Sequence, residues 1–203
     1  NENNKTEEDL SSYFSYMLLL PLLIIIPFFA LFYLFYENIA LYESAKNAIV
    51  YDFVWEIPLI AFFIGYFEIF YAWLRAHMKS VFGSFVKEVF VRILVTISLF
   101  GVYFKFITLP EFIHSLVIVY GISLLVIIYY ANKVKPIQLN KKFPKNTKSI
   151  FVFTIFIILS ASVANMLLDI DKYMINQFLK IENIAFYSLA VYLAMVISVP
   201  QRA

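Results

Sequence analysis

The sequence lacks cysteine altogether and has only four glycines among its 203 residues. Without cysteine, the chain can form neither disulfide bonds nor thiolate metal sites. The few glycines form neither a phosphate-binding loop nor a dinucleotide-binding motif. Charged residues are also scarce, at 15% of the chain, against about 25% in an ordinary soluble domain. These shortages exclude a disulfide framework and give no support to nucleotide binding.

Hydrophobic residues, in contrast, make up 63% of the chain, aromatic residues make up 20%, and the mean hydropathy is +0.82. A soluble domain of this size could not bury so much apolar surface, and the exposed remainder would aggregate. Composition therefore excludes a soluble enzyme, a nucleic-acid-binding protein and a disordered tail. It predicts an integral membrane protein, whose net charge of +2 indicates no particular partner.

Six apolar stretches have the length of a membrane-spanning helix, which needs about 20 mostly apolar residues. They are residues 13–36, 54–74, 89–109, 112–131, 149–168 and 183–201. Each run is continuous, whereas the strands of a membrane barrel are shorter and alternate in polarity. The sequence therefore predicts an all-α integral membrane protein with six transmembrane helices.

The distribution of basic residues predicts the orientation, because short cytoplasmic loops collect Lys and Arg. Segment 132–148 contains six lysines and no acidic residue. The loops expected on the other side, 37–50, 105–111 and 169–182, contain residues of both charges. We therefore expect 132–148 and both chain ends to lie in the cytoplasm.

The same basic segment predicts the domain organisation. Residues 132–148 form a linker between a four-helix block, 1–131, and a two-helix block, 149–203. The chain begins without Met and stops directly after the sixth apolar stretch. We therefore expect an internal part of a longer protein.

Charged residues inside apolar stretches are functional candidates, because burying a charge in lipid is costly. Glu68 is the deepest acidic residue, and Arg75 lies two helical turns away on the same face. Glu68 is either a protonatable group or cavity wall, or a side chain that reaches the interface. Glu88 and Arg92 form either an interfacial ion pair or a cavity site where Arg92 meets an anion such as phosphate.

Asp52 and Glu56 lie four residues apart at the outer end of the second stretch. Two neighbouring carboxylates suit a cation or proton site. Acidic residues are more commonly found at an exposed helix N-terminus, where the helix dipole favours them. Both interpretations remain open from the sequence.

A polar stripe follows the fifth stretch at helical spacing. Its members are Ser162, Asn165, Asp169, Lys172 and Asn176. The spacing predicts that this helix continues beyond the hydrocarbon, with one polar edge. That edge lines a cavity between the two blocks or forms hydrogen bonds between helices.

Support for catalysis or for a cofactor is weak. Neither His77 nor His114 belongs to a pair with metal-ligand spacing, and no nucleophile elbow is present. We therefore expect no enzymatic activity, no metal and no cofactor.

Several short segments resemble a known family. The first pair is YAWLRAHMKSVF at 71–82 with FVKEVFVR at 85–92, and the second is DIDKYMI at 169–175 with IAFYSLA at 184–190, before Val199-Pro200. They are similar to motifs of bacterial flippases for lipid-linked oligosaccharides, of the O-antigen and capsule type. These belong to the multidrug/oligosaccharidyl-lipid/polysaccharide exporter superfamily. The chain departs from their motifs at 176–180, where family members usually have glycine.

The resemblance implies a two-lobe MATE-like transporter fold of about fourteen helices, of which the six stretches would be the third to the eighth. It implies export of an undecaprenyl-diphosphate-linked oligosaccharide across a bacterial inner membrane by alternating access. Arg75 and Arg92 would meet the diphosphate, while Glu68 and Asp171 would couple protons or monovalent cations. The alternatives are a drug or cation antiporter of the same superfamily, a membrane enzyme of surface-glycan assembly, and a structural membrane subunit.

Overall fold

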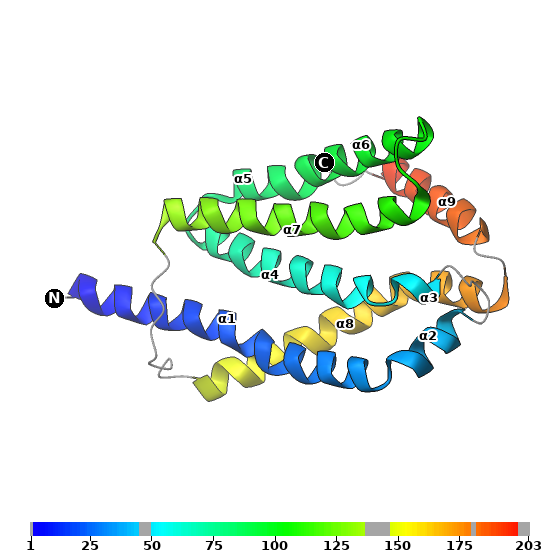
Figure 1. Ribbon diagram of the computed structural model, residues 1–203. Coiled ribbons are helices and arrows are strands. Elements are labelled where there is room, and N and C mark those ends of the chain that lie inside the picture. The colour runs from blue at the N-terminus through cyan, green and yellow to red at the C-terminus, as the bar shows by residue number, and fades with distance from the viewer. Residues whose placement is uncertain (1, 45–49, 137–146, 180–181, 199–203) are drawn as a thin grey trace. The chain divides into compact units, whose positions relative to one another are not determined.

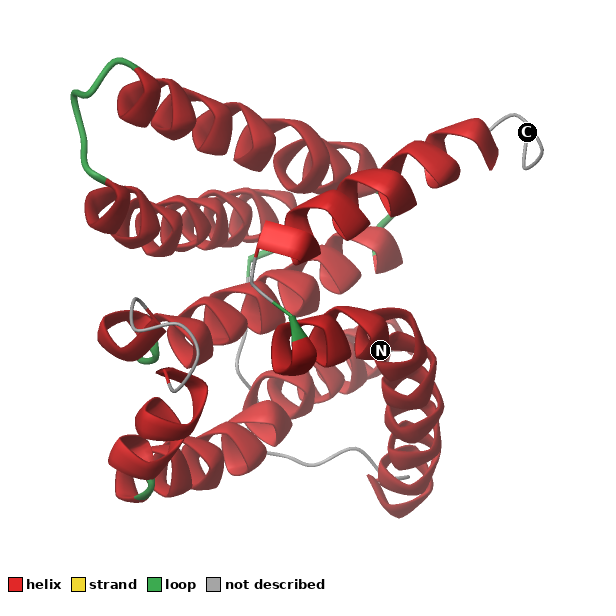
Figure 2. Cartoon of the chain, turned by 90° about the vertical axis from the view of Figure 1, so that its right-hand side faces the viewer, coloured by secondary structure: helices red, strands yellow, loops and turns green. Residues whose placement is uncertain are grey.

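The computed structural model describes residues 2–44, 50–136, 147–179 and 182–198. Nearly all of these residues are helical, and none of them lies in a strand (Figures 1 and 2). The elements are α1 (Glu2–Leu34), α2 (Tyr36–Ser44), α3 (Val50–Phe53), α4 (Glu56–Ala76), α5 (Ser80–Phe85), the π-helical turn η1 (Val86–Phe90), α6 (Val91–Tyr103), α7 (Leu109–Val134), α8 (Thr147–Phe178) and α9 (Glu182–Ser198).

The chain divides into two compact units. Unit 1 comprises Asn1–Ala40 and Ile49–Lys145, and unit 2 comprises Leu41–Ala48 and Asn146–Ala203. Most of the predicted linker, residues 137–146, lies outside the described residues. Each unit is therefore described by itself.

Four helical segments are long and apolar enough to cross a membrane. They are Ser11–Leu34, Tyr51–Ala76, Leu109–Val134 and Thr147–Leu167. These segments coincide with the first, second, fourth and fifth apolar stretches, which confirms for the described residues an all-helical structure with helices long and apolar enough to cross a membrane. The sixth stretch contains a shorter apolar helix, Asn183–Ala194, within α9.

The third apolar stretch folds differently from the prediction. It was expected to run from 89 to 109, but the helical segment begins at Ser80 and ends at Tyr103. Lys105 adopts a left-handed conformation with a φ angle of 61°, so it lies in a turn and not in a helix. Thr108 then caps α7 by accepting a hydrogen bond from the Glu111 backbone N–H, while its own N–H donates to the Glu111 carboxylate. This capping box starts α7 at Leu109, within the loop 105–111 that was expected between the third and fourth stretches.

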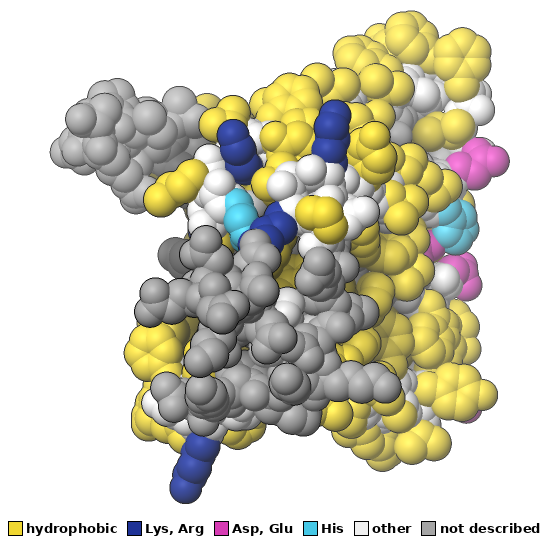
Figure 3. Space-filling view, turned by 90° about the vertical axis from the view of Figure 1, so that its left-hand side faces the viewer, with side chains coloured by type: hydrophobic (Ala, Val, Ile, Leu, Met, Phe, Trp, Pro, Cys, Tyr) yellow, Lys and Arg dark blue, Asp and Glu magenta, His cyan; other side chains and the backbone are white. Residues whose placement is uncertain are grey.

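In unit 1, α7 packs against both α4 and α6 (Figure 1). The core forms mainly between α4 and α7, with Phe14 of α1 against Trp73 at a ring-centroid distance of 4.4 Å. Phe82 of α5 stacks on Tyr130 of α7 at 4.0 Å. Outside this core, hydrophobic side chains cover much of the described surface (Figure 3), as expected for helices that face lipid.

Leu74 offers a test of this core, because its side chain is fully buried between α4 and α7, at 0% exposure. Leu74→Ala leaves a cavity and should lower the free energy of unfolding by about 2–5 kcal/mol. The matched control is Leu125→Ala on α7, since Leu125 is 66% exposed. A thermal melt of purified protein in detergent should show a lower midpoint for Leu74→Ala alone. Equal midpoints for the two variants would contradict this packing.

In unit 2, α8 is a single helix of 32 residues from Thr147 to Phe178. The prediction that this helix continues beyond the apolar stretch 149–168 is therefore confirmed. The Tyr187 hydroxyl of α9 donates a hydrogen bond of 2.7 Å to the Asp171 carboxylate of α8. This bond joins the two helices of unit 2.

Candidate functional site

The site begins with the tight turn between α4 and α5. After α4 ends at Ala76, Met78 takes a left-handed conformation with φ of 58°, and the Lys79 N–H donates to the Leu74 carbonyl at 2.9 Å. This pattern satisfies the last carbonyls of α4 and reverses the chain. The segment that follows therefore runs back along α4.

Tyr71 fixes how the two arms of this hairpin meet. Its hydroxyl is 2.7 Å from the Ser84 hydroxyl, and its ring packs against Gly83. A side chain at position 83 would overlap the ring, so glycine allows α4 and α5 to approach closely. The contact holds α5 against the last turns of α4.

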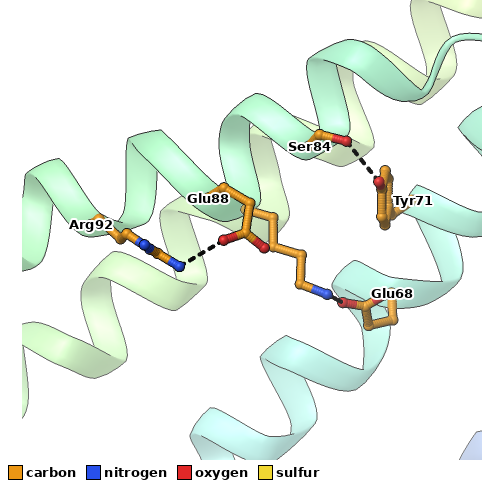
Figure 4. Close-up of polar contacts among 6 residues, drawn as sticks. Glu68, Tyr71, Ser84, Glu88 and Arg92 are labelled. Atoms are coloured by element: carbon orange, nitrogen blue, oxygen red, sulfur yellow. Dashed lines mark hydrogen bonds and ion pairs between the residues drawn. The ribbon is translucent and has the colours of Figure 1, made fainter. Parts of the chain in front are cut away.

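Two ion pairs form on the hairpin beyond this contact (Figure 4). Lys87 Nζ of η1 donates to Glu68 Oε1 of α4 at 2.6 Å, which links the two arms. Arg92 Nη2 of α6 donates to Glu88 Oε2 of η1 at 2.8 Å, within one helical segment. Both signs of charge therefore meet on facing helices of unit 1.

The π-helical turn η1 carries two of these four side chains, Lys87 and Glu88. A π turn inserts one extra residue into a helix, and such turns are rare and frequent at functional sites. The sequence of 86–90 has no Gly or Pro that would mark this irregularity. Sequence reasoning therefore identified Glu88 and Arg92 but missed the role of Lys87.

The charged side chains line a cavity of about 260 Å³ formed by α4, η1, α6 and α7. Its apolar wall includes Ile64, Phe67 and Val91, and α7 contributes Tyr120 and Ser123. The Ser123 hydroxyl donates to the Tyr120 carbonyl at 2.7 Å. The cavity thus combines an apolar wall with two carboxylates and two cations.

The distance of the charged side chains from the helix ends shows how deeply they would lie if these helices cross a membrane. At 1.5 Å per residue, Arg92 lies about 18 Å from the start of α5 and about 16 Å from the end of α6. Glu68 lies about 12 Å from the end of α4. The four side chains are between 38% and 69% exposed. An arginine that faces lipid at the centre of a membrane helix costs about 3 kcal/mol on insertion scales, so if the α5–α6 segment crosses a membrane, these side chains require water or further protein beside them.

Arg75, the other predicted cationic residue, is not among the residues that line this cavity. It lies in the last turn of α4, exposed, with its guanidinium carbon 4.8 Å from the centre of the Tyr71 ring. Arg75 and Glu68 therefore contact different partners, although they lie two turns apart on one helix.

The predicted acidic pair at the other end of α4 also separates. Asp52 is exposed on α3, whereas Glu56 is buried in the first turn of α4. Within the described chain, the carboxylate of Glu56 has no hydrogen bond, but it forms an ion pair with Nδ1 of His114 on α7 if this histidine is protonated. No sequence pattern indicates this pairing, because the two residues lie far apart in the chain.

In unit 2, the polar stripe of α8 is only partly engaged. Lys172 Nζ donates to Asp169 Oδ1 at 2.7 Å, one turn away, while Asn165 and Ser162 are exposed. The side chain of Asn176 lies outside the described residues. Asp171 is not on the stripe and accepts the hydrogen bond from Tyr187 described above.

Among the described residues, no group of three or more His, Asp or Glu side chains could hold a metal ion. Comparisons with family models, with curated proteins and with solved structures find no match for this chain.

Proposed function

We propose that the protein is a membrane transporter of the flippase type, which exports a lipid-linked oligosaccharide for surface polysaccharide synthesis. In this proposal α1, α4, the α5–α6 segment, α7, α8 and α9 are six crossings of a bacterial inner membrane, with both ends of the chain in the cytoplasm. The observation that carries the proposal is the charged cavity halfway along the helices of unit 1.

Charges at such a depth support a transport function. Ionisable side chains in membrane spans are rare, and they typically line pathways for ions or substrates. A helix that only anchors a protein has no need of ion pairs within its membrane-spanning part. Lys87 and Arg92 together supply the donors that a phosphate group requires.

A second feature of unit 1 supports a lipid as cargo. An apolar groove of about 350 Å³ lies between α1 and α4. It is lined by Leu22, Ile25, Ile26, Phe29, Leu59 and Phe62. A groove of this composition suits a hydrocarbon chain, while the charged cavity suits a polar head group.

The division into two units supports alternating access. In the proposal, unit 1 belongs to one lobe and α8 and α9 begin the other, as in transporters that rock two lobes around a central site. Asn165, Asp169 and Lys172 would then face the substrate path. Asp171 would take part in coupling to protons or monovalent cations.

Reconstitution into lipid vesicles tests the proposal. The purified protein is incorporated into vesicles that contain a fluorescent undecaprenyl-diphosphate-linked oligosaccharide, and a glycosidase added outside measures how much glycan is accessible. We expect the protein to raise the rate at which inner-leaflet glycan becomes accessible, and not to move the same lipid without its glycan. Transport of small cationic drugs without glycan movement would replace the proposal with an antiporter, and absence of both would overturn it.

A further inference from the structure

The end of unit 1 that holds the α4–α5 turn combines positive charge with exposed apolar side chains. Arg75 lies in the last turn of α4, Lys79 in the turn itself, and Lys133 in the last turn of α7, and all three are exposed. Met78 of the turn is 90% exposed, and Val81 at the start of α5 is 82% exposed. Apolar side chains flanked by cations suit a surface with hydrocarbon beneath a negatively charged layer.

Core packing brings these three cations to the same end of unit 1. Leu74 of α4 and Ala131 of α7 are fully buried in one core cluster. Phe82 of α5 stacks on Tyr130 of α7 at a ring-centroid distance of 4.0 Å. The end of α7 therefore lies beside the α4–α5 turn, and Lys and Arg side chains gather on this face among hydrophobic atoms (Figure 3).

The charge at this end is available to an anion. Among the described residues, none of the three cations forms an ion pair with an acidic side chain. Arg75 lies over the ring of Tyr71, with its guanidinium carbon 4.8 Å from the ring centre. A stacked guanidinium keeps its N–H donors in its own plane, where they can bind two oxygens of a phosphate group. By contrast, Lys87 and Arg92 of the cavity are already paired with carboxylates.

The candidate spans place this end at the surface of a membrane. Tyr51–Ala76 and Leu109–Val134 are long and apolar enough to cross a membrane, and Arg75 and Lys133 lie in the last turns of these segments. Tyr129 is exposed one turn before Lys133, and tyrosine is enriched at the level of the lipid head groups. Cations at that level meet the phosphates of the lipids.

We propose that this end of unit 1 binds the phosphodiester head group of an acidic phospholipid. Arg75, Lys79 and Lys133 contact the phosphate, while Met78 and Val81 lie among the first carbons of the acyl chains. Charge complementarity favours a lipid with net negative charge, such as phosphatidylglycerol, over a zwitterionic lipid. The apolar tip favours a lipid surface over an acidic soluble protein. This binding requires only that α4 and α7 cross a membrane, and it is independent of any transported substrate.

The two tryptophans of the chain, Trp55 and Trp73, provide separate reporters for the two ends of α4. They lie about 27 Å apart along the helix at 1.5 Å per residue. Trp55→Phe leaves Trp73 as the reporter of the basic end, and Trp73→Phe leaves Trp55 as the reporter of the other end. Each purified variant is placed in phosphatidylcholine nanodiscs with increasing amounts of nitroxide-labelled phosphatidylglycerol or nitroxide-labelled phosphatidylcholine. Quenching of tryptophan fluorescence then gives the relative association constant of the two lipids.

The Trp73 reporter should show a strong preference for the acidic lipid. Each basic residue near an anionic surface strengthens the attraction roughly fivefold, so we expect at least fivefold tighter association of phosphatidylglycerol at low salt. High salt should abolish the preference, because exposed charges are screened. Arg75→Gln/Lys79→Gln/Lys133→Gln should abolish it as well. The Trp55 reporter should show no preference.

Two further variants separate the contributions of charge and of the apolar tip. Lys105→Gln removes a cation from the exposed turn before α7 and should leave the preference unchanged. Met78→Asn/Val81→Ser should reduce quenching by both lipids and keep the preference, since asparagine tolerates the left-handed conformation at position 78. Unchanged quenching in this variant would show that the tip lies outside the lipid, and would replace the lipid surface with an acidic soluble partner.

The outcomes that overturn the proposal are distinct from failure of the transport function. Equal association of the two lipids at the Trp73 reporter, in a protein with a normal thermal midpoint, would overturn the lipid site. A preference that survives Arg75→Gln/Lys79→Gln/Lys133→Gln would also overturn it. The nanodiscs contain no oligosaccharide lipid, so neither result alters the glycan-accessibility measurement, which tests transport independently.

Discussion

Arg92→Gln should lower export of surface polysaccharide by about 10- to 100-fold. Hydrogen bonds to charged groups contribute about 1.5–3 kcal/mol, and each 1.4 kcal/mol corresponds to a factor of about ten. Arg92 is the most central of the four charges, and its removal also leaves Glu88 without its partner. The measurement is surface polysaccharide in cells whose own copy of the protein is replaced by the variant at normal abundance.

Two variants separate this effect from a general loss of positive charge. Arg92→Lys keeps the charge but loses the planar fork of donors, so it should retain only part of the export. Lys105→Gln removes a cation from the exposed turn before α7 and should leave export unchanged. Normal export by Arg92→Gln would remove the arginine from the transport mechanism.

Gly83→Ala should destabilise unit 1 by about 1–3 kcal/mol, the usual cost of overpacking. A Cβ atom at position 83 would overlap the Tyr71 ring, with Cε2 only 2.8 Å away. The ring can move only by breaking its contact with Ser84. Because this contact holds α5 against α4, we expect the variant to lower both the thermal midpoint and export.

Gly65→Ala is the matched control, since no heavy atom lies within 4 Å of its Cβ position. It should stabilise α4 by roughly 0.5–1 kcal/mol, because alanine favours a helix over glycine. In a double-mutant cycle, Gly83→Ala should cost much less when Tyr71→Ala is already present. Equal effects of Gly83→Ala in both backgrounds would show that the ring does not limit the approach of the helices.

The membrane-spanning helices were largely predictable from the sequence, because hydropathy reflects the length of a crossing directly. Residues 112–131 lie within α7, and residues 149–168 lie within α8. The polar spacing on α8 also predicted correctly that the helix extends beyond its apolar part. Such features depend on consecutive residues, which a sequence shows without knowledge of the fold.

The candidate site was predictable only in part. Glu88 and Arg92 are four residues apart, so their pairing follows from helical spacing alone. The contact between Glu68 and Lys87 depends on the tight turn after Ala76 and on the π turn, neither of which has a strong sequence signal. The end of α6 was misplaced because Phe104 and Phe106 are as apolar as the helix before them, although they belong to a turn.

The most direct test of the account uses the absence of cysteine from the chain. Arg92→Cys and Ile93→Cys introduce single thiols at the same depth of α6, on neighbouring exposed positions. A membrane-impermeant maleimide reacts only where water reaches the thiol as its thiolate. If the charged site faces a water-filled cavity, intact membranes should show labelling of Arg92→Cys and none of Ile93→Cys. Absence of labelling at position 92 by the impermeant maleimide, together with quenching by spin-labelled lipid of a probe attached there through a membrane-permeant maleimide, would contradict the account.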